Sequence, residues 1–398
     1  MERCDALARC SEEADRLTRR YGTPALAEAR ELVAGWMRDA GLDTRFDPIG
    51  NVVGRLAGDG ERTLVLGSHL DTVVDAGRYD GALGVLAALS CVARLREREL
   101  PFALEVVGFA DEEGVRFGTA FLGSAVVVGC FEKDWLGRVD RDGVTLGDAV
   151  RGWGGDPEAL AAARRRPEEL IGYVEVHIEQ GPVLDDAGLP LGVVTGIAGQ
   201  SRAGLTFSGR AGHAGTTPMG TRCDALAAAA GWIGAVEVEA RAHDGLVATV
   251  GEIAVEPGAA NVIPGRAAAS LDVRHAEDGV REGAVRALRE AALRMADARG
   301  VAVAWDEIQA TKAVPCSPEL TEELAAAVAG TGREAPRLTS GAGHDAAMMS
   351  AVTPIAMLFV RCAGGISHHP DESVREEDVA AALDATTALI ERLAKEPS

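Results

Sequence analysis

The chain has 398 residues, of which 47% are hydrophobic, and it carries a formal net charge of −21. This length and composition predict a globular protein with about two or three domains. The negative charge disfavours nucleic acid and anionic membrane surfaces as partners, because both are polyanions that would repel the chain.

The N-terminal segment, residues 1–5, lacks the apolar core that a signal peptide has. The longest apolar stretch, residues 226–236, is too short to span a bilayer. The 7 cysteines are scattered without a CxxC pair, so neither a thiolate zinc site nor a redox motif is visible. We therefore expect a cytoplasmic protein without a membrane segment.

The first half of the chain alternates between helical and strand patterns. An amphipathic pattern over residues 24–41 predicts a helix, and an apolar run that ends at His69 predicts a strand. A further helix is expected over residues 84–98 and a further strand over residues 102–113. This alternation predicts the α/β class, with a mixed, mostly parallel central sheet flanked by helices and with ligands at the carboxyl ends of the strands.

Residues 203–315 show a different and nearly symmetrical order of elements. Strands are expected at residues 203–213, 246–258, 261–275 and 301–309, and helices at residues 224–242 and 279–300. This β-α-β-β-α-β order is typical of a ferredoxin-like unit.

Beyond residue 315 the α/β pattern resumes, with a strand expected at residues 353–361 and a closing helix at residues 376–395. The ferredoxin-like unit therefore interrupts a larger domain. We expect a discontinuous catalytic domain made of residues 1–202 and 316–398, and an inserted domain at residues 203–315.

Residues that could carry chemistry gather in five short motifs, and the first is the Ser-His-Leu-Asp segment that contains His69 and Asp71. Residues two apart on an extended strand point the same way, so Asp71 can accept the second ring N–H of His69 while the other nitrogen binds a cation. The second motif, GRYDGALG, places Asp80 just before a helix. Its two oxygens could bridge two metal ions, and an ordinary helix N-cap is the alternative.

The third motif places Asp111, Glu112 and Glu113 together at the end of an apolar strand, with no basic residue before Arg116. Three acids would repel one another in a cleft, so they are either solvated or neutralised by a multivalent cation. Neighbouring side chains on a strand face opposite ways. One glutamate can therefore coordinate a metal while the other acts as a general base.

The fourth motif, YVEVHIEQGPVL, alternates so that His177 shares the polar face with Glu175 and Glu179. The fifth, GGISHHPDE, is a glycine-rich loop that offers His368 and His369, of which one could bind a metal while the other contacts substrate or solvent. Imidazoles and carboxylates without a thiolate suit a pair of divalent ions such as Zn²⁺, Mn²⁺, Co²⁺ or Ni²⁺. Two metal ions favour hydrolysis.

These motifs, together with GRAGHAGTTPM, NVIPG and SGAGHDAAMM, occur in the same order as in the amidase/hydantoinase/carbamoylase branch of the dimetal aminoacylase and carboxypeptidase superfamily. The chain resembles this branch along nearly its whole length. The resemblance implies a zinc-aminopeptidase-like catalytic domain, and an inserted domain that serves as a lid and joins two chains in a homodimer.

The resemblance also implies two divalent metal ions per subunit. One ion would be held by His69, Asp80 and His177, and the other by Asp80, Glu113 and His368. Asp80 would then bridge the two ions. The sequence alone leaves open whether His369 takes the place of His368.

In the same way, Glu112 is implied as the general base and Asp71 as a second catalytic residue. His213 would reach from the inserted domain of a partner subunit to polarise the scissile carbonyl. The implied contacts of the substrate are Gln180, His213, Asn261, Arg274, Gly343 and His344. Arginine suits a carboxylate because its planar fork offers two parallel hydrogen bonds.

His177 stands where carboxypeptidase-like and aminoacylase-like relatives usually carry an acidic ligand, which favours a ureido substrate over a peptide. The segments LARCSEEADRLTRRYGTPA and DAGRYDG are most similar to allantoate amidohydrolases. We therefore expect hydrolysis of the terminal ureido C–N bond of allantoate, a reaction of purine catabolism that releases ammonia and CO₂. The alternatives are an N-carbamoyl-L-amino acid hydrolase or a 3-ureidopropionase, then a dipeptidase or aminoacylase, and last a non-catalytic binding protein.

Overall fold

The computed structural model describes residues 1–395. They form two compact units: a large unit, made of Met1–Thr195 and the described residues from Cys316 onward, and a small unit, Gly196–Pro315. The boundary expected at residue 203 falls inside strand β7 (Gly199–Ser208). The small unit begins earlier, at Gly196 in the last residues of β6, and so contains the whole of β7.

The large unit is built on a mixed sheet with the strand order β1-β2-β4-β3-β5-β16-β6. Its strands are β1 (Asp43–Phe46), β2 (Val52–Leu56), β3 (Thr63–His69), β4 (Ala103–Phe109), β5 (Leu170–Ile178), β6 (Leu191–Ile197), β15 (Arg337–Ser340) and β16 (Ile355–Val360). The four central strands, β4, β3, β5 and β16, are parallel, whereas β1, β2 and β6 join the sheet by antiparallel pairing. The predicted fold class is thus confirmed, with the parallel pairing confined to the centre of the sheet.

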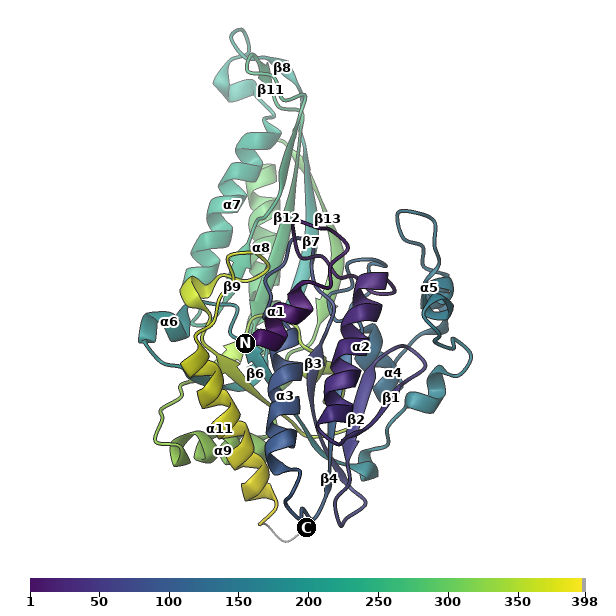
Figure 1. Cartoon of the computed structure of the whole chain (residues 1–398). Helices are drawn as coiled ribbons and strands as arrows, with labels where there is room; N and C mark the ends of the chain where they lie inside the picture. The colour runs from purple at the N-terminus through teal and green to yellow at the C-terminus, as the bar shows by residue number, and fades with distance from the viewer. Residues whose placement is uncertain (396–398) are drawn as a thin grey trace. The chain divides into compact units, whose positions relative to one another are not determined.

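Four long helices cover one face of this sheet (Figure 1): α2 (Pro24–Asp39), α3 (Ala82–Leu95), α9 (Pro318–Gly330) and α11 (Glu376–Leu393). Their apolar residues share one core with alternate strand residues such as Leu64, Leu66, Val174 and Val176. The shorter helices of the large unit are α1 (Glu2–Ala8), α4 (Leu122–Val128), α5 (Leu146–Gly152), α6 (Val183–Ala187) and α10 (Asp345–Met349).

The parallel centre decides where the polar motifs meet. Parallel strands present their carboxyl ends at one edge of a sheet. Strand β3 ends at His69, the chain leaving β4 continues into Asp111, and His177 is the second-last residue of β5. Three motifs that are far apart in the sequence therefore reach the same edge.

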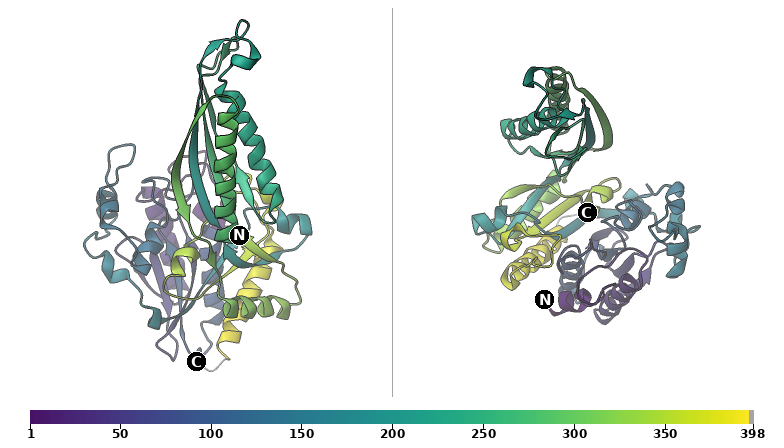
Figure 2. Two further views of the ribbon diagram at one scale, coloured as in Figure 1. Left: turned by 180° about the vertical axis from the view of Figure 1, so that it is seen from behind. Right: turned by 90° about the horizontal axis from the view of Figure 1, so that it is seen from above.

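The small unit has the ferredoxin-like order of elements. Its sheet runs β10-β12-β7-β13 with antiparallel pairing, and helices α7 (Ala225–Ala242) and α8 (Asp278–Asp297) lie side by side on one face of it (Figure 2). Its strands are β7 (Gly199–Ser208), β8 (Gly212–His213), β9 (Val247–Thr249), β10 (Ile253–Glu256), β11 (Val262–Ile263), β12 (Arg266–His275), β13 (Ala302–Thr311) and β14 (Val314–Pro315).

Two predicted strands are each divided in the structure. The strand expected at residues 246–258 forms β9 and β10, because residues 250–252 lie opposite only two residues of β12 and bulge out of the sheet. The strand expected at residues 261–275 forms β11 and β12. Pro264 has no N–H for a ladder, and Gly265 instead donates its N–H to Glu256.

No helix within residues 1–395 combines the length and the apolar character needed to cross a membrane. The apolar stretch at residues 226–236 belongs to α7, whose Ala228, Ala229 and Trp232 are buried in the core of the small unit. This stretch is therefore a packing surface within the fold.

Helix α3 packs so closely on the sheet that Gly84 leaves no room for a side chain. A Cβ at Gly84 would lie 2.2 Å from the carbonyl oxygen of Val176 and 2.7 Å from the Cβ of Ser68. Gly84→Ala should therefore lower the free energy of unfolding by about 1–3 kcal/mol through overpacking. Gly35, in α2, has no atom within 4 Å of such a Cβ. Gly35→Ala should stabilise by up to about 1 kcal/mol, because alanine is the better helix former. Thermal unfolding of both variants tests this, and equal shifts of the same sign would contradict it.

Candidate metal centre

Asp80 lies at the centre of a cluster of imidazoles and carboxylates, at the turn before α3. Its side chain is only 4% exposed. Oδ1 lies 3.2 Å from Nε2 of His177 and 3.7 Å from Nε2 of His69. Oδ2 lies 3.1 Å from Nε2 of His368, which is also 3.4 Å from a carboxylate oxygen of Glu113. Each oxygen of Asp80 therefore faces a different set of ligand atoms.

Within the described residues, four groups of three side chains bring their ligand atoms within 4.8 Å of one another, and two of these groups share Asp80. One is His69, Asp80 and His177, and the other is Asp80, Glu113 and His368. The structure thus brings together the five residues expected from the sequence as metal ligands, in the two sets that the resemblance implies. His369 lies outside both sets, since its side chain is 56% exposed and its Nδ1 accepts the N–H of Asp371.

The two buried histidines turn the same nitrogen toward Asp80. Nδ1 of His69 lies 3.1 Å from the carbonyl oxygen of Asp71, and Nδ1 of His177 lies 2.9 Å from that of Ile178. A carbonyl oxygen can only accept a hydrogen bond, so Nδ1 carries the proton and Nε2 is left to bind a cation.

The donor set fits a divalent cation. Oδ1 of Asp80 and Nε2 of His177 are buried, yet neither makes a hydrogen bond of acceptable geometry. Buried polar atoms without a partner are costly and rare in folded proteins. A cation between these atoms would satisfy both of them, and nitrogen and oxygen ligands without sulfur suit Zn²⁺, Mn²⁺, Co²⁺ and Ni²⁺.

The electrostatics of the cluster also favour a bound cation. Burial would raise the pKa of Asp80, but the nearby imidazoles of His177, His368 and His69 outweigh it and hold this pKa well below its ordinary range. Burial, supported by repulsion from Asp80, raises the pKa of Glu113 to about 7. An ion in the cluster would remove this repulsion and displace the proton from Glu113.

Asp71 holds the segment that carries the two glutamates. Its Oδ1 accepts the N–H of Glu112 at 2.9 Å, and its Oδ2 accepts the N–H of Glu113 at 3.1 Å. The sequence predicted that the Asp71 carboxylate accepts the ring N–H of His69, but it is 3.4 Å from Nδ1 and the main-chain oxygen is closer. The reason is that β3 ends at His69, so the alternation of an extended strand no longer applies at Asp71.

Glu112 lies beside the cluster without belonging to the two groups that share Asp80. It is 8% exposed, and burial, with repulsion from Glu113, raises its pKa well above the ordinary value, although His69 opposes the shift. A carboxylate with a raised pKa suits a group that takes up and returns a proton. A Cβ on Gly343 would lie 3.6 Å from Oε1 of Glu112 and 2.9 Å from the ring of Phe121, so this glycine keeps space open next to the carboxylate.

His344 was expected as a substrate contact, but the structure places it under the ligands. It is 1% exposed, its ring meets that of His177 edge-on at 4.5 Å, and its Nε2 lies 2.7 Å from the hydroxyl of Ser340. Burial, with repulsion from His177, holds the pKa of His344 well below its ordinary value, so the ring stays neutral. We therefore assign it to positioning His177.

Glu175 and Glu372 are supporting carboxylates to which the sequence analysis gave no role. Glu175 accepts hydrogen bonds from the hydroxyl of Ser68 and the N–H of Ala346, and so ties β5 to β3 and α10. Glu372 accepts the N–H groups of Tyr79 and Asp80 and fixes the turn that presents Asp80. The role of Glu175 could have been inferred, because it shares a strand face with His177. The role of Glu372 could not, because it depends on a contact between distant parts of the chain.

Gln180 also reaches the cluster. Its Nε2 donates to Oδ2 of Asp80 at 3.1 Å. Gln180 and His368 have positive φ angles, of 58° and 56°, which are uncommon for residues other than glycine. Backbone strain of this kind concentrates at functional sites.

The predicted residues of the small unit divide into two places. His213 pairs with Val262 between β8 and β11, and the neighbouring Asn261 accepts the N–H of Ala214; both side chains are exposed. Arg274 lies near the opposite end of β12, where its guanidinium binds the carboxylate of Asp272 at 2.9 and 3.0 Å. Figure 1 shows β8 and β11 at one end of the small unit and β9, which pairs with Arg274, at the other. A strand of ten residues measures roughly 30 Å, so the two places are that far apart.

Comparisons with known proteins identify the family of the chain and several relatives. The family model described as Peptidase family M20/M25/M40 matches residues 65–392. A probable allantoate deiminase of Oryza sativa subsp. japonica is 42% identical, over 96% of this chain and 85% of the relative. An N-carbamoyl-L-amino acid amidohydrolase of Geobacillus stearothermophilus is 40% identical, over 95% of this chain and 94% of the relative. The crystal structure of an amidase of the hydantoinase/carbamoylase family from Burkholderia multivorans superposes with a TM-score of 0.94 at 34% identity, covering 100% of this chain and 97% of that one.

The two adjacent histidines of the fifth motif provide a matched test of the cluster. His368→Ala removes an imidazole from the group with Asp80 and Glu113, so it should lower the bound metal by about one ion per chain. His369→Ala should leave the metal content unchanged. Elemental analysis by mass spectrometry, after loading with Zn²⁺ and desalting, measures both. Equal losses in the two variants would contradict the assignment.

Proposed function

The chain belongs to the peptidase family M20/M25/M40, and we propose that it is a metal-dependent amidohydrolase that cleaves the terminal ureido C–N bond of a small ureido acid. The observation that carries this proposal is the pair of three-residue groups that share Asp80 next to the buried carboxylate of Glu112. Allantoate is the substrate we favour, because the rice relative named for it is 42% identical. The reaction would then belong to purine catabolism.

We propose two divalent ions per subunit, held by His69, Asp80, Glu113, His177 and His368. Such a pair acts as a Lewis acid and lowers the pKa of water, which is the chemistry that amide hydrolysis requires at neutral pH. The chain itself supplies the geometry: carbonyl oxygens orient His69 and His177, and Glu372 holds the turn at Asp80.

Glu112 is the group that moves protons in this proposal. It accepts a proton from the attacking water and returns it to the departing nitrogen, which leaves as ammonia. The remaining carbamate then loses CO₂ and gives an amine. Asp71 keeps Glu112 in place through its main-chain N–H, and Gly343 leaves room beside the carboxylate for the ureido group.

The distance within the small unit supports a homodimer. A ureido acid is far smaller than the roughly 30 Å that separates His213 and Asn261 from Arg274 along β12. One small molecule therefore cannot touch both places of the same chain. We propose that His213, with Asn261, completes the site of a partner subunit and that the small unit joins the two chains.

N-carbamoyl-L-amino acids are the second candidate substrates. The Geobacillus stearothermophilus relative is 40% identical and is covered over 94% of its length, so the preference for allantoate rests on a small difference. 3-Ureidopropionate has the same ureido group and carboxylate and is a third candidate.

Ammonia release should separate these candidates. With Mn²⁺, Zn²⁺, Co²⁺ or Ni²⁺ present, we expect turnover of allantoate to exceed that of N-carbamoyl-L-amino acids and of 3-ureidopropionate, and a chelator should abolish it. Glu112→Gln should lower kcat by a factor of about 10²–10⁴ while both metals stay bound. Glu97→Gln, at a site that is 86% exposed, serves as the control. Release of amine from acyl amino acids or dipeptides, without ammonia from any ureido compound, would overturn the proposed reaction.

Mixed dimers test the contribution of the partner. His213→Ala and Glu112→Gln should each be nearly inactive alone with their metals retained. Mixing refolded chains of the two variants creates dimers in which one site has both residues. Random pairing should then restore roughly one quarter of the wild-type activity. Mixtures no more active than the parents, although exchange of chains is verified, would exclude the contribution across subunits.

A further inference from the structure

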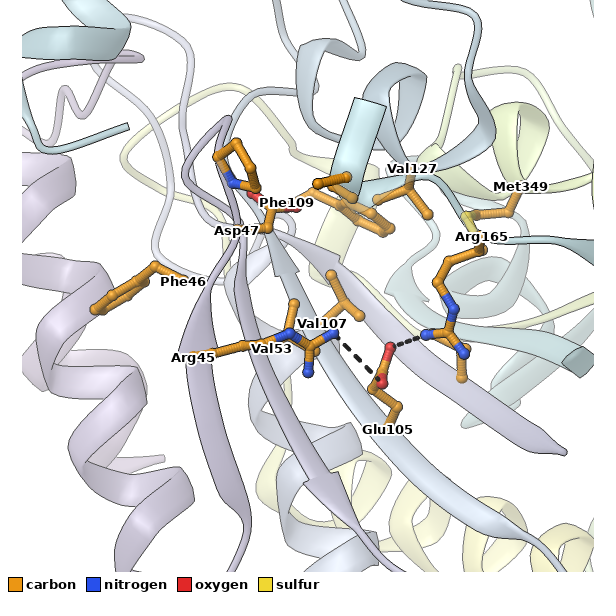
Figure 3. A pocket seen from close by; sticks show the side chains of 14 residues that line it. Arg45, Phe46, Asp47, Val53, Glu105, Val107, Phe109, Val127, Arg165 and Met349 are labelled. Carbon is orange, nitrogen blue, oxygen red and sulfur yellow. Dashed lines mark hydrogen bonds and ion pairs between the residues drawn. The ribbon is translucent and has the colours of Figure 1, made fainter. Parts of the chain in front are cut away.

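A cavity of about 210 Å³ lies in the large unit and shares no residue with the metal centre. Its floor is the face of the central sheet opposite to the core of α2 and α3, since it is lined by Val65, Val107 and Phe109, the residues that alternate with that core. Figure 3 shows Val107 and Phe109 of these strands together with Val127 and Met349 around the cavity.

One half of the cavity is apolar. Phe109, Val127 and Met349 line it, and none of them offers a hydrogen bond from its side chain. A dry cavity of about 150 Å³ is sufficient to bind benzene. The space here is larger, so it holds an aromatic ring or a branched aliphatic group together with a small polar group.

The other half is lined by charged side chains, namely Arg45, Arg165, Asp47 and Glu105. Glu105 is 3% exposed, and one of its oxygens accepts a hydrogen bond from Arg165, as Figure 3 shows. Its second oxygen lies 3.6 Å from Arg55 and 3.9 Å from Arg45, which are ion pairs longer than hydrogen bonds. One carboxylate thus faces three guanidinium groups, of which Arg165 is also paired with Glu169.

Asp47 is the second acid that lines the cavity. The carboxylate of Asp47 accepts hydrogen bonds from the side chain of Asn51 and from the main-chain N–H groups of Ile49, Gly50 and Asn51. It is therefore engaged within its own turn. Arg45, which is 53% exposed and lies 3.9 Å from Glu105, is the cation of the lining that is open to a further partner.

We propose that this cavity binds a small monocarboxylate with an aromatic or branched apolar body. The carboxylate pairs with Arg45, and the body fills the space between Phe109, Val127 and Met349. The ligand contacts β3 and β4, the strands that lead to His69 and to the Asp111–Glu113 segment. The proposal does not depend on the reaction catalysed at the metal centre.

Benzoate is a suitable probe, with benzyl alcohol and benzylamine as neutral and cationic molecules of the same size. We expect calorimetric titration of the full chain to give binding of benzoate at least about tenfold tighter than of either analogue, because the charged pair is lost in both. Binding should persist with saturating ureido substrate on the Glu112→Gln variant, which separates this cavity from the proposed active site.

Two variants assign the binding to the cavity. Arg45→Ala should weaken benzoate binding by about tenfold, whereas Arg141→Ala, at an exposed position outside the cavity, should leave it unchanged. Ala163→Leu places a larger side chain at the cavity wall and should abolish binding. Circular dichroism and the thermal midpoint verify that both variants are folded.

Three results would overturn the proposal. The first is the absence of benzoate binding at millimolar concentration, and the second is benzoate binding that neither Arg45→Ala nor Ala163→Leu weakens. The third is tighter binding of benzylamine, which would make Glu105 the recognising group and the ligand a cation. Loss of ureido hydrolysis would leave this proposal untouched, since the titration detects binding alone.

Discussion

The buried carboxylate of Asp80 is the constraint around which the metal centre is arranged. A charged group that is 4% exposed is stable only when cations or hydrogen-bond donors surround it. Here three imidazoles approach its two oxygens. The turn after Asp80 also requires a glycine. Gly81 has a φ of 64°, and a Cβ there would lie 2.4 Å from the ring of His69. The position next to Asp80 therefore tolerates only glycine.

Support for the cluster comes mainly from the backbone rather than from further ionic pairs. Carbonyl oxygens orient His69 and His177, while main-chain N–H groups bind the carboxylates of Asp71 and Glu372. Fixed dipoles of this kind cost little reorganisation when a charge arrives. The central strands of the sheet hold these dipoles in place, and this explains why the cluster lies at the edge where the parallel strands end.

The sequence predicted the position of a residue well where that position follows from the residue's own strand or helix. His177 lies on the polar face of β5 as the alternation predicted, and the helices at residues 224–242 and 376–395 end within a few residues of their predicted limits. It was less informative where the setting depends on contacts between distant segments. The resemblance implied His344 as a substrate contact, and nothing in its local sequence indicated that its ring packs against that of His177 and is buried. The hydrogen-bond partners of Glu372 lie nearly three hundred residues away in the sequence, and no local pattern predicts them.

The length of β12 limits how the small unit can serve the site. A strand of ten residues with paired neighbours on both sides is stiff. Its two ends therefore stay roughly 30 Å apart even if the small unit moves as a rigid body. Movement of the small unit could bring Arg274 or His213 to a given substrate, but not both from the same chain. A site that requires both must draw on two chains. In the proposed homodimer, a folded monomer with a full set of metal ligands would therefore still lack part of its site.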